Sequence, residues 1–303
     1  MSMPFHDPVP RPLLRRSVLS VPAINPRALA KAPALACDAV IFDLEDSVAP
    51  QMKEEARANL RALFKDRGPG DQEWIIRVNA ADSAFFADDM QAVIDCGPDA
   101  VLLPKVGASE ELQAAADALS GAGLSDLPLM AMMETTHGVL NAPAIARWGV
   151  AGKRLSAFVI GLNDLRRETG VLPDPQRTYL IPWLMQIVLV ARAYGIDVID
   201  SVSNDFRDLD AFGKECGQGR AMGFDGKMLI HPAQIAAANA HFSPSAAEIA
   251  DAEATVAAFA DPSAAGLNVV TVNGRMVERL HLEQAERLIA RADLIQARKS
   301  KTE

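Results

Sequence analysis

The chain contains 303 residues with a formal net charge of −9, and 50% of its residues are hydrophobic. This acidic balance excludes the broad basic face that a nucleic acid or an anionic membrane surface requires, while the length suits one large α/β barrel or two medium domains. The three cysteines, Cys37, Cys96 and Cys216, form no CxxC pair, which argues against a disulfide scaffold or a thiolate zinc site.

In chain order, residues 1–15 contain several prolines without a periodic pattern and predict an irregular arm. Short apolar stretches then predict strands at 17–21, 39–46, 74–79, 100–105, 129–133, 155–160, 195–200 and 226–232. Amphipathic stretches between them predict helices at 26–35, 52–64, 84–94, 110–119, 139–148, 179–194 and 208–222. The first helix is expected to be capped by Asn25 and opened by Pro26, and a loop is expected between 160 and 179.

Eight strand-then-helix units without an antiparallel hairpin among them predict a closed (β/α)₈ TIM barrel over residues 16–240. A doubly wound open sheet also alternates strands and helices, but it usually has a glycine-rich phosphate turn after its first strand. The corresponding segment here, VPAINP at 21–26, has no such turn.

The pattern changes after the barrel, so residues 241–303 are predicted to form an extension that serves as a lid or a subunit contact. It contains an alanine-rich helix at 246–260, a short strand with an Asn-Gly turn at 267–274, and a final helix at 282–298. No stretch resembles a signal peptide or approaches the roughly 20 apolar residues that cross a bilayer. We therefore expect a cytoplasmic protein without a membrane or nucleic-acid partner.

Two carboxylates follow directly on apolar strands, Glu134 after 129–133 and Asp164 after 155–160. The carboxyl ends of parallel strands form the edge where ligands bind and catalytic groups collect. Two hard oxygen ligands at that edge, with space for water and an oxygen-rich substrate, suit Mg²⁺. The competing interpretation is a pair of helix caps, because acidic residues also favour helix N-termini.

The second predicted strand ends in three carboxylates, Asp43, Glu45 and Asp46, which repel one another unless positive charge lies nearby. Alone, they would be interpreted as a solvated turn. Arg77 lies inside the apolar strand 74–79, where an unpaired guanidinium would be costly, so it requires an anionic partner. That partner is either a structural one among the 43–46 carboxylates or a carboxylate or enolate oxygen of a substrate, and the two are compatible.

In their order along the chain, nine segments between Arg16 and about Ala292 resemble the citrate lyase beta-subunit-like family, within the HpcH/HpaI aldolase superfamily that includes malyl-CoA and citramalyl-CoA lyases. The segments are RSVLSVPAINPRALAKA, AVIFDLEDSVAP, KEEAR, RVN, LLPKV, METTHGVLNAPAIA, FVIGLNDL, GFDGKMLIHPAQI and NGRMVE. The resemblance implies a Mg²⁺-dependent carbon–carbon lyase with a TIM barrel. Such an enzyme cleaves a 3-hydroxyacyl-CoA thioester into acetyl-CoA and an oxo acid, or condenses the two.

The resemblance also implies roles for single residues. The metal is expected on Glu134 and Asp164, with Glu45 and Asp46 bonded to metal-bound waters. Arg77 is expected to hold the oxo-acid side of the substrate. Glu278 stands where lyases of this family tend to carry an aspartate, supplied from the C-terminal segment and credited with proton transfer at the acetyl carbon. A solvated glutamate at a helix start is the alternative for Glu278.

Coenzyme A, as part of the thioester substrate, is the other ligand that the resemblance implies. Arg27 and Lys31 lie one turn apart on the first predicted helix and could face its phosphates, and Lys105 is a further candidate for anion or thioester contacts. His137 is expected to serve structure, and His231 is expected to shape the mouth of the eighth strand or to contact a cofactor. Neither is expected to carry the proton.

Three other functions remain open at this stage: a pyruvate-type aldolase without coenzyme A, an acyl-CoA thioesterase, and an acyl-CoA or acyl-carrier-binding subunit of a lyase complex. The thioesterase would use the same metal site with water as nucleophile. A homo-oligomer, a trimer or hexamer, is expected with a small oxo acid and acyl-CoA as ligands.

Overall fold

The structure is a computed structural model that describes residues 13–152 and 154–302. Residues 1–12, most of the expected N-terminal arm, lie outside the described residues. The chain folds as two compact units, Arg15–Phe242 and a C-terminal unit from Ser243 onward. None of the helices within the described ranges is long and apolar enough to cross a membrane.

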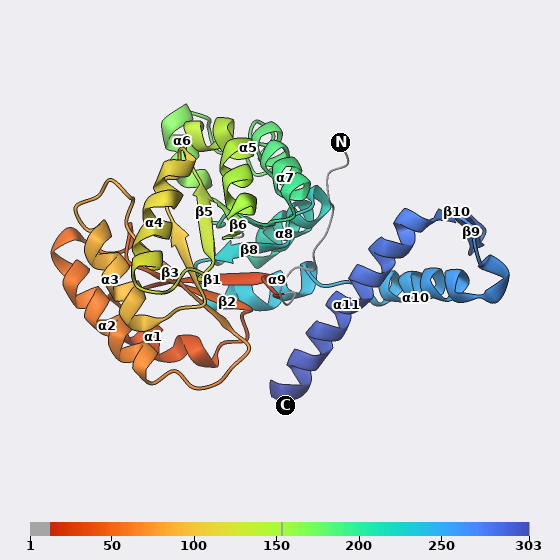
Figure 1. Cartoon of the computed structure of the whole chain (residues 1–303), viewed down its shortest axis with the longest axis horizontal. Coiled ribbons are helices and arrows are strands. Elements are labelled where there is room, and N and C mark those ends of the chain that lie inside the picture. Colours follow the sequence, from red (N-terminus) through yellow and green to blue (C-terminus); the bar gives the residue numbers. More distant parts are fainter. Residues whose placement is uncertain (1–12, 153, 303) are drawn as a thin grey trace. The chain divides into compact units, whose positions relative to one another are not determined.

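Eight parallel strands form a closed barrel in the Arg15–Phe242 unit, each paired with its neighbours in chain order and β1 paired with β8. This confirms the predicted TIM barrel, and Figure 1 shows the helices outside its strands. The strands are β1 (Ser17–Pro22), β2 (Ala39–Asp43), β3 (Glu73–Arg77), β4 (Ala100–Leu103), β5 (Leu129–Met133), β6 (Leu155–Ile160), β7 (Asp197–Asp200) and β8 (Gly226–Leu229).

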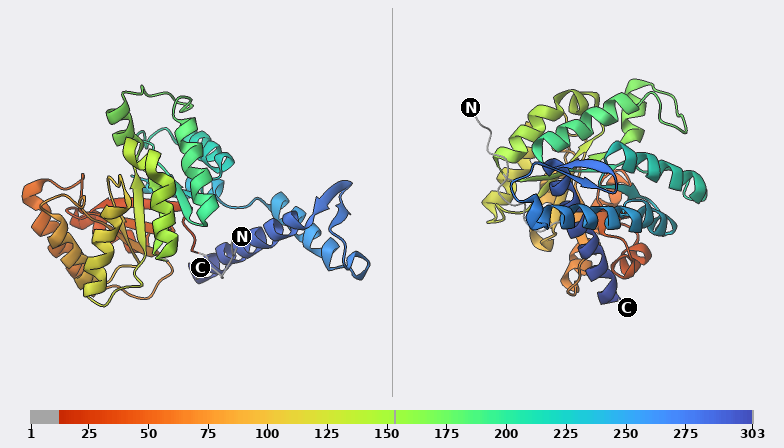
Figure 2. Two further views of the ribbon diagram at one scale, coloured as in Figure 1. Left: turned by 45° about the horizontal axis from the view of Figure 1, so that its top comes forward. Right: turned by 90° about the vertical axis from the view of Figure 1, so that its right-hand side faces the viewer.

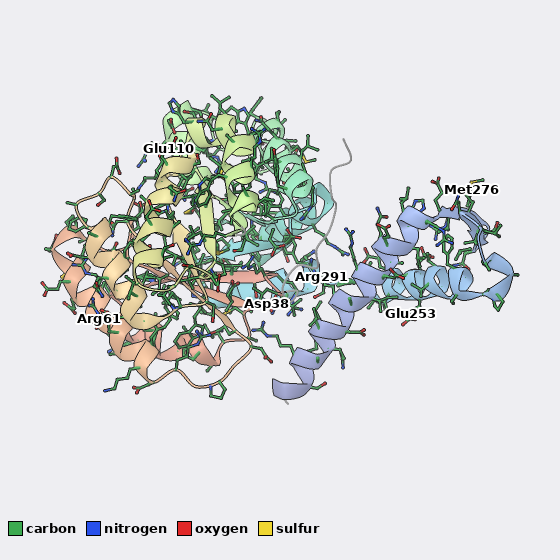
Figure 3. All side chains as sticks on the ribbon, viewed as in Figure 1. Asp38, Arg61, Glu110, Glu253, Met276 and Arg291 are labelled. Atoms are coloured by element: carbon green, nitrogen blue, oxygen red, sulfur yellow. The ribbon has the colours of Figure 1, made fainter. Side chains whose placement is uncertain are left out.

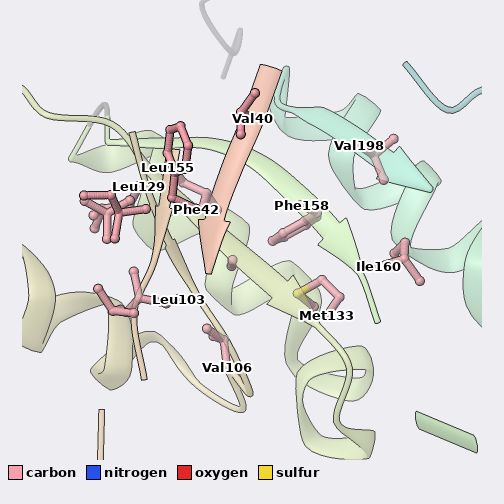
Figure 4. Packing of buried hydrophobic residues seen from close by; sticks show 14 of the residues in the cluster. Val40, Phe42, Leu103, Val106, Leu129, Met133, Leu155, Phe158, Ile160 and Val198 are labelled. Carbon is pink, nitrogen blue, oxygen red and sulfur yellow. The ribbon is translucent and has the colours of Figure 1, made fainter. Parts of the chain in front are cut away.

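Alternate side chains along the strands fill two separate apolar layers. Val40 and Phe42 of β2 pack outward in the layer between strands and helices, which Figure 4 shows. Ala39 and Ile41 point inward and pack with residues such as Ile75 and Met132 inside the barrel. Because the side-chain period of a strand is two, the next inward positions at the carboxyl edge are 43, 77 and 134. The packing of the core therefore directs these three charged side chains into the mouth of the barrel.

The helices of this unit are α1 (Pro26–Lys31), α2 (Lys53–Lys65), α3 (Phe86–Cys96), α4 (Ser109–Gly121), α5 (Thr136–Ala151), α6 (Leu162–Thr169), α7 (Ile181–Tyr194), α8 (Leu209–Met222) and α9 (Ile235–His241). Short 3₁₀ turns lie at Ala32–Ala34, Pro50–Met52 and Pro232–Gln234. Asn25 caps α1 as predicted, because its side chain accepts a hydrogen bond from the Ala28 N–H. Charged residues such as Arg61 and Glu110 lie exposed on the helices (Figure 3).

Helix α6 was not expected, because the sequence predicted only a loop between residues 160 and 179. Its segment, LNDLRRET, is polar throughout except for Leu162 and Leu165, which are its buried residues. A helix of eight residues that buries two side chains leaves little periodic signal in the sequence. This helix carries Asp164 in its first turn, so Asp164 lies on a helix rather than in a loop.

The C-terminal unit contains α10 (Ala246–Ala260), a 3₁₀ turn at Pro262–Ala264, the hairpin of β9 (Val269–Val272) and β10 (Arg275–Glu278), and α11 (Arg279–Thr302). Figure 2 shows the hairpin joined directly to the long helix α11. Asn273 and Gly274 both have positive φ, 50° and 75°, as a two-residue hairpin turn requires. The predicted Asn-Gly turn is therefore confirmed, while α11 begins three residues earlier than position 282.

Candidate active site at the carboxyl edge of the barrel

Arg77 and Asp43 form a buried ion pair at the ends of two adjacent strands. The two residues are register partners of β3 and β2. Arg77 donates from Nε to Asp43 Oδ1 at 2.6 Å and from Nη2 to Oδ2 at 2.7 Å. Such a two-point bond satisfies both carboxylate oxygens. The structural partner considered for Arg77 is therefore present, while its Nη1 lies 3.3 Å from Glu45 Oε2.

Asp43 also fixes the loop that follows β2. It accepts hydrogen bonds from the Glu45 N–H at 2.8 Å and the Ser47 N–H at 3.1 Å. Burial alone would raise the pKa of Asp43, but the Arg77 guanidinium and these N–H donors hold it below its ordinary value. Asp43 therefore links β2, β3 and the loop through its hydrogen bonds.

Lys105 connects this loop to Glu134. Its ammonium bonds to the Glu45 carboxylate and lies 3.2 Å from Asp46 Oδ1, so the expected positive charge does lie beside the acidic cluster. Its backbone N–H donates to Glu134 Oε1 at 2.7 Å. The backbone of Lys105 has a φ of 54°, an uncommon conformation for a residue with a side chain. Lys105 thus orients two carboxylates at once, by its main chain and by its side chain.

Glu134 is a buried carboxylate close to the charges of Asp164 and Glu45. Its exposed fraction is only 2%, and burial together with the charges of Asp164 and Glu45 raises its pKa to about 7. The Lys105 N–H and the charge of Arg77 oppose this rise without cancelling it. Glu134 does not cap α5, because Thr135 does so through its hydroxyl at 2.9 Å from the Gly138 nitrogen. The helix-cap interpretation is therefore wrong for Glu134.

Asp164 is the second carboxylate whose charge acts on Glu134. It is half-buried in the first turn of α6 and accepts a hydrogen bond from Arg167 at 2.5 Å. Across residues 13–152 and 154–302, no three histidine, cysteine or acidic side chains cluster as metal ligands. A cation between Glu134 and Asp164 would thus have two protein carboxylates and would need further oxygens from water or a substrate. That donor set is typical of Mg²⁺, and a cation would compensate the buried charge of Glu134 and its repulsion by Asp164.

Gly161 lies where a side chain would collide with Glu134. A Cβ atom at this position would lie 2.4 Å from Glu134 Oε2 and 2.5 Å from Glu134 Cβ. Real atoms do not approach so closely, so the end of β6 can pass Glu134 only if residue 161 is glycine. The residue is therefore part of the site although it carries no functional group.

Changing Gly161 to alanine is expected to displace the Glu134 carboxylate and to weaken Mg²⁺ binding by roughly 10–100-fold, the usual effect of disturbing a ligand's support. Isothermal titration calorimetry with Mg²⁺ measures this change. Gly152, where an added Cβ would make only ordinary contacts, provides the matched glycine-to-alanine control. Unchanged Mg²⁺ affinity in the Gly161 variant would contradict the assignment.

The remaining predicted residues lie at varied places. Arg27 and Lys31 are exposed on α1, which follows β1 at the same edge of the barrel. His231 caps the 3₁₀ turn at 232–234 and stacks on Phe206, with ring centroids 4.5 Å apart. Glu278 lies exposed at the end of β10 in the C-terminal unit, and its N–H donates to a histidine nitrogen. The structure thus brings together the carboxylates of the β2–α2 loop, Arg77 at the end of β3, Lys105, Glu134 and Asp164.

Sequence reasoning missed Gly161, Lys53 and Asn79. Lys53 and Asn79 belong to the KEEAR and RVN segments, but their side chains are buried and bonded to the loop after β2. Lys53 at the start of α2 and Asn79 just after β3 are single polar residues, and nothing in the neighbouring sequence indicates that they bond to the loop after β2. The usable signal was their occurrence in two of the nine segments, one of which also carries Arg77.

An eight-stranded barrel with its charged side chains at the carboxyl edge is the arrangement of TIM-barrel enzymes. The chain belongs to the HpcH/HpaI aldolase/citrate lyase family, whose model matches residues 16–232. This confirms the resemblance inferred from the nine segments.

Known relatives extend over nearly the whole chain. A (3S)-malyl-CoA thioesterase of Cereibacter sphaeroides is 45% identical over 282 residues, which cover 93% of this chain and 96% of the relative. The mitochondrial citramalyl-CoA lyase of Homo sapiens is 34% identical, with 93% and 86% covered. A crystal structure of CitE from Mycobacterium tuberculosis with magnesium, acetoacetate and coenzyme A has a TM-score of 0.74 at 29% identity, covering 91% of this chain and 97% of that one.

Proposed function

We propose that this chain is a Mg²⁺-dependent carbon–carbon lyase that cleaves a malyl-CoA-type 3-hydroxyacyl-CoA thioester into acetyl-CoA and a small oxo acid. The observation that carries the proposal is the buried Glu134 carboxylate, which accepts a hydrogen bond from the Lys105 N–H and whose pKa is raised to about 7 by burial and by the charges of Asp164 and Glu45. Similar structures from Mycobacterium tuberculosis contain magnesium with oxaloacetate or with pyruvate. Oxo acids are products of carbon–carbon cleavage, which favours the lyase reaction.

In this proposal Glu134 and Asp164 hold Mg²⁺, which when bound supplies a Lewis acid for the oxygens of the oxo-acid part. Arg77 is bonded to Asp43 through Nε and Nη2, while its Nη1 contacts Met132 Sδ at 3.5 Å and lies 3.3 Å from Glu45 Oε2. Nη1 is the nitrogen proposed to stabilise developing negative charge. Glu45 and Asp46 would accept hydrogen bonds from water around a bound cation, and Lys105 bonds to both carboxylates. Arg27 and Lys31, with Lys105, are the proposed contacts of coenzyme A.

Glu278 is the proposed proton carrier at the acetyl carbon. Replacing Glu278 with glutamine is expected to lower the rate of carbon–carbon cleavage by roughly 10²-fold, because a positioned acid or base typically contributes at least that much. Mg²⁺ affinity should stay the same, since Glu278 holds no cation in this proposal. Rates of acetyl-CoA formation from malyl-CoA measure the effect. Glu286, an exposed glutamate on α11, provides the control variant; equal rates for the two variants would remove Glu278 from the mechanism.

Thioester hydrolysis is the second candidate, and the 45% identity to a thioesterase specifically favours it. Hydrolysis consumes water and releases free coenzyme A with the intact hydroxy acid. Cleavage, in contrast, releases acetyl-CoA and the oxo acid, and no free thiol forms.

One assay separates the two reactions. Purified protein with Mg²⁺ is given malyl-CoA or citramalyl-CoA, and free thiol and oxo acid are quantified in the same sample. Equal amounts of oxo acid and acetyl-CoA without free thiol support the lyase, while free thiol without oxo acid supports the thioesterase. Tight thioester binding with neither product would instead indicate a binding subunit of a larger complex.

A further inference from the structure

The ammonium group of Lys53 is buried beneath the loop that carries Glu45. Lys53 has an exposed fraction of 5% and lies in the first turn of α2. Its Nζ donates to the backbone carbonyls of Leu44 at 2.7 Å and Glu45 at 2.8 Å, and to the Asn79 side-chain oxygen at 2.8 Å. An ammonium has three N–H donors, so these acceptors match its full capacity. A buried charge is stable only when it is satisfied in this way.

Asn79 is held in turn by α3 and α2. Its backbone N–H and its side-chain amide both donate to Asp89 Oδ2, and the amide also donates to the Leu44 carbonyl at 3.0 Å. Arg57 donates to Asp89 Oδ1 at 3.0 Å from one turn further along α2. We name Lys53, Arg57, Asn79 and Asp89 the Lys53 clamp. The clamp joins two helices and the end of β3 to a single point on the β2–α2 loop.

The point that the clamp holds is the backbone between two site carboxylates. Asp43 precedes it and is bonded to Arg77, while the Glu45 side chain follows and is bonded to Lys105. Glu45 is itself buried, and its Oε2 accepts no hydrogen bond from the described part of the chain, although Arg77 Nη1 lies 3.3 Å away. Because Lys53 bonds directly to two carbonyls and an amide oxygen, its role there is to fix the backbone rather than to neutralise a bonded carboxylate.

We propose that Lys53 is a positioning residue of the active site: by fixing the Leu44–Glu45 backbone, it holds the Glu45 carboxylate against Arg77 and Lys105. The proposal rests on the proposed function, since it assigns Glu45 a part in turnover. It also explains why the KEEAR and RVN segments accompany the acidic cluster in the sequence. Lys53 and Arg57 come from the first segment, and Asn79 comes from the second.

The test in solution is a double-mutant cycle between Lys53 and Glu45. Lys53→Met keeps the length of the side chain and removes its donors, and it should lower kcat by roughly 10–100-fold, because small misplacements of catalytic groups cost about that much. Mg²⁺ affinity should fall by a smaller factor than kcat, because the clamp contacts neither Glu134 nor Asp164 and reaches the cation only through Glu45. In a Glu45→Gln background, Lys53→Met should lower kcat less than about twofold further, as expected when one residue acts through another. Full additivity in the cycle would overturn the proposal.

A second measurement does not depend on activity. Amide hydrogen exchange over residues 44–48 should accelerate in Lys53→Met by about tenfold or more relative to exchange in β6, because local opening is set by local bonds. Lys65→Met, at the exposed end of the same helix, is the control and should leave both regions unchanged. If Lys53→Met fails to fold, Asn79→Ser is used instead, because it removes the amide that bonds to both Lys53 and the Leu44 carbonyl. Exchange over residues 44–48 is then compared with exchange in β6 in the same way. If amide exchange accelerated equally across the barrel, Lys53 would stabilise the whole fold rather than this loop, and the proposal would be contradicted.

The two measurements also separate the proposal from the function on which it rests. If the wild-type protein turns over none of the thioesters, the proposed function fails, while the exchange experiment still shows whether Lys53 fixes the loop. If turnover is present and exchange over 44–48 is unchanged in the Lys53 variant, the positioning role fails while the function stands.

Discussion

Replacing Glu134 with glutamine is expected to lower Mg²⁺-dependent turnover by about 10³-fold or more, because a Lewis acid contributes several kcal/mol to such a reaction. Glutamine preserves the volume of the side chain and can still accept the hydrogen bond from the Lys105 N–H. It removes the charge that pairs with Asp164 around the cation. Steady-state rates of oxo-acid formation, with Mg²⁺ titrated in parallel, measure the effect. A Glu110→Gln variant, changed at an exposed position of α4, should behave as wild type.

The same variant should change how Mg²⁺ binding depends on pH. Protons compete with the cation for Glu134, whose pKa is raised to about 7 in the metal-free protein, chiefly by burial. Mg²⁺ affinity of the wild type should therefore fall by about tenfold for each pH unit below 7. Calorimetric titrations between pH 5.5 and 8 test this, and the glutamine variant should bind weakly throughout. An affinity independent of pH in the wild type would contradict the role of Glu134.

Folding stability without metal should follow the opposite pH trend. The pKa of Glu134 is higher in the folded chain, about 7, than its ordinary value of 4.5. The folded state therefore binds more protons between these values, so this contribution is fully present below about pH 4.5 and is lost as the pH rises through about 7. In the presence of EDTA, the melting temperature of the wild type should fall more between pH 5 and pH 8 than that of Glu134→Gln.

The barrel could be predicted from the sequence because its strands carry their own signal. Runs such as Leu129–Met133 and Leu155–Ile160 are apolar on both faces, as strands covered by helices and filling a barrel must be. The site could be located for a related reason. Glu134 directly follows an apolar strand, and Arg77 comes at the end of one. Charged side chains at these positions are accommodated at the carboxyl edge of the barrel.

The partners within the site could not be predicted in this way. That Arg77 bonds to Asp43 depends on the register between β3 and β2, and that Lys105 reaches both Glu45 and Glu134 depends on a left-handed backbone at a residue other than glycine. Glycine is required at position 161 because the ends of β5 and β6 bring it too close to Glu134 for a side chain. Register and spacing of this kind arise from the closed barrel as a whole, so no local stretch encodes them.

At the opposite edge of the barrel, replacing Arg15 with methionine is expected to destabilise the protein by about 3–5 kcal/mol. Arg15 has an exposed fraction of 3% and donates to Glu73 from two nitrogens at 2.6 and 2.8 Å. A third nitrogen donates to Asp197 at 3.0 Å and to the Ser156 carbonyl at 3.3 Å. The guanidinium thus links β3, β6 and β7 below the barrel interior. Its loss leaves the buried Glu73 carboxylate uncompensated, which is the costly part of breaking such a pair.

Thermal unfolding measures this cost, and the melting temperature should fall by roughly 6–20 °C for a chain of this size. Arg61→Met is the matched control, because the Arg61 side chain is 40% exposed in its pair with Asp95 and exposed pairs contribute about 0–1 kcal/mol. Adding Glu73→Gln to the Arg15 variant should recover part of the loss, since the uncompensated charge is then removed. Mg²⁺ affinity should be unaffected in all three variants, because β3 separates Glu73 at its first residue from Arg77 at its last. A melting temperature that falls no further in Arg15→Met than in Arg61→Met would show that this pair does not stabilise the barrel.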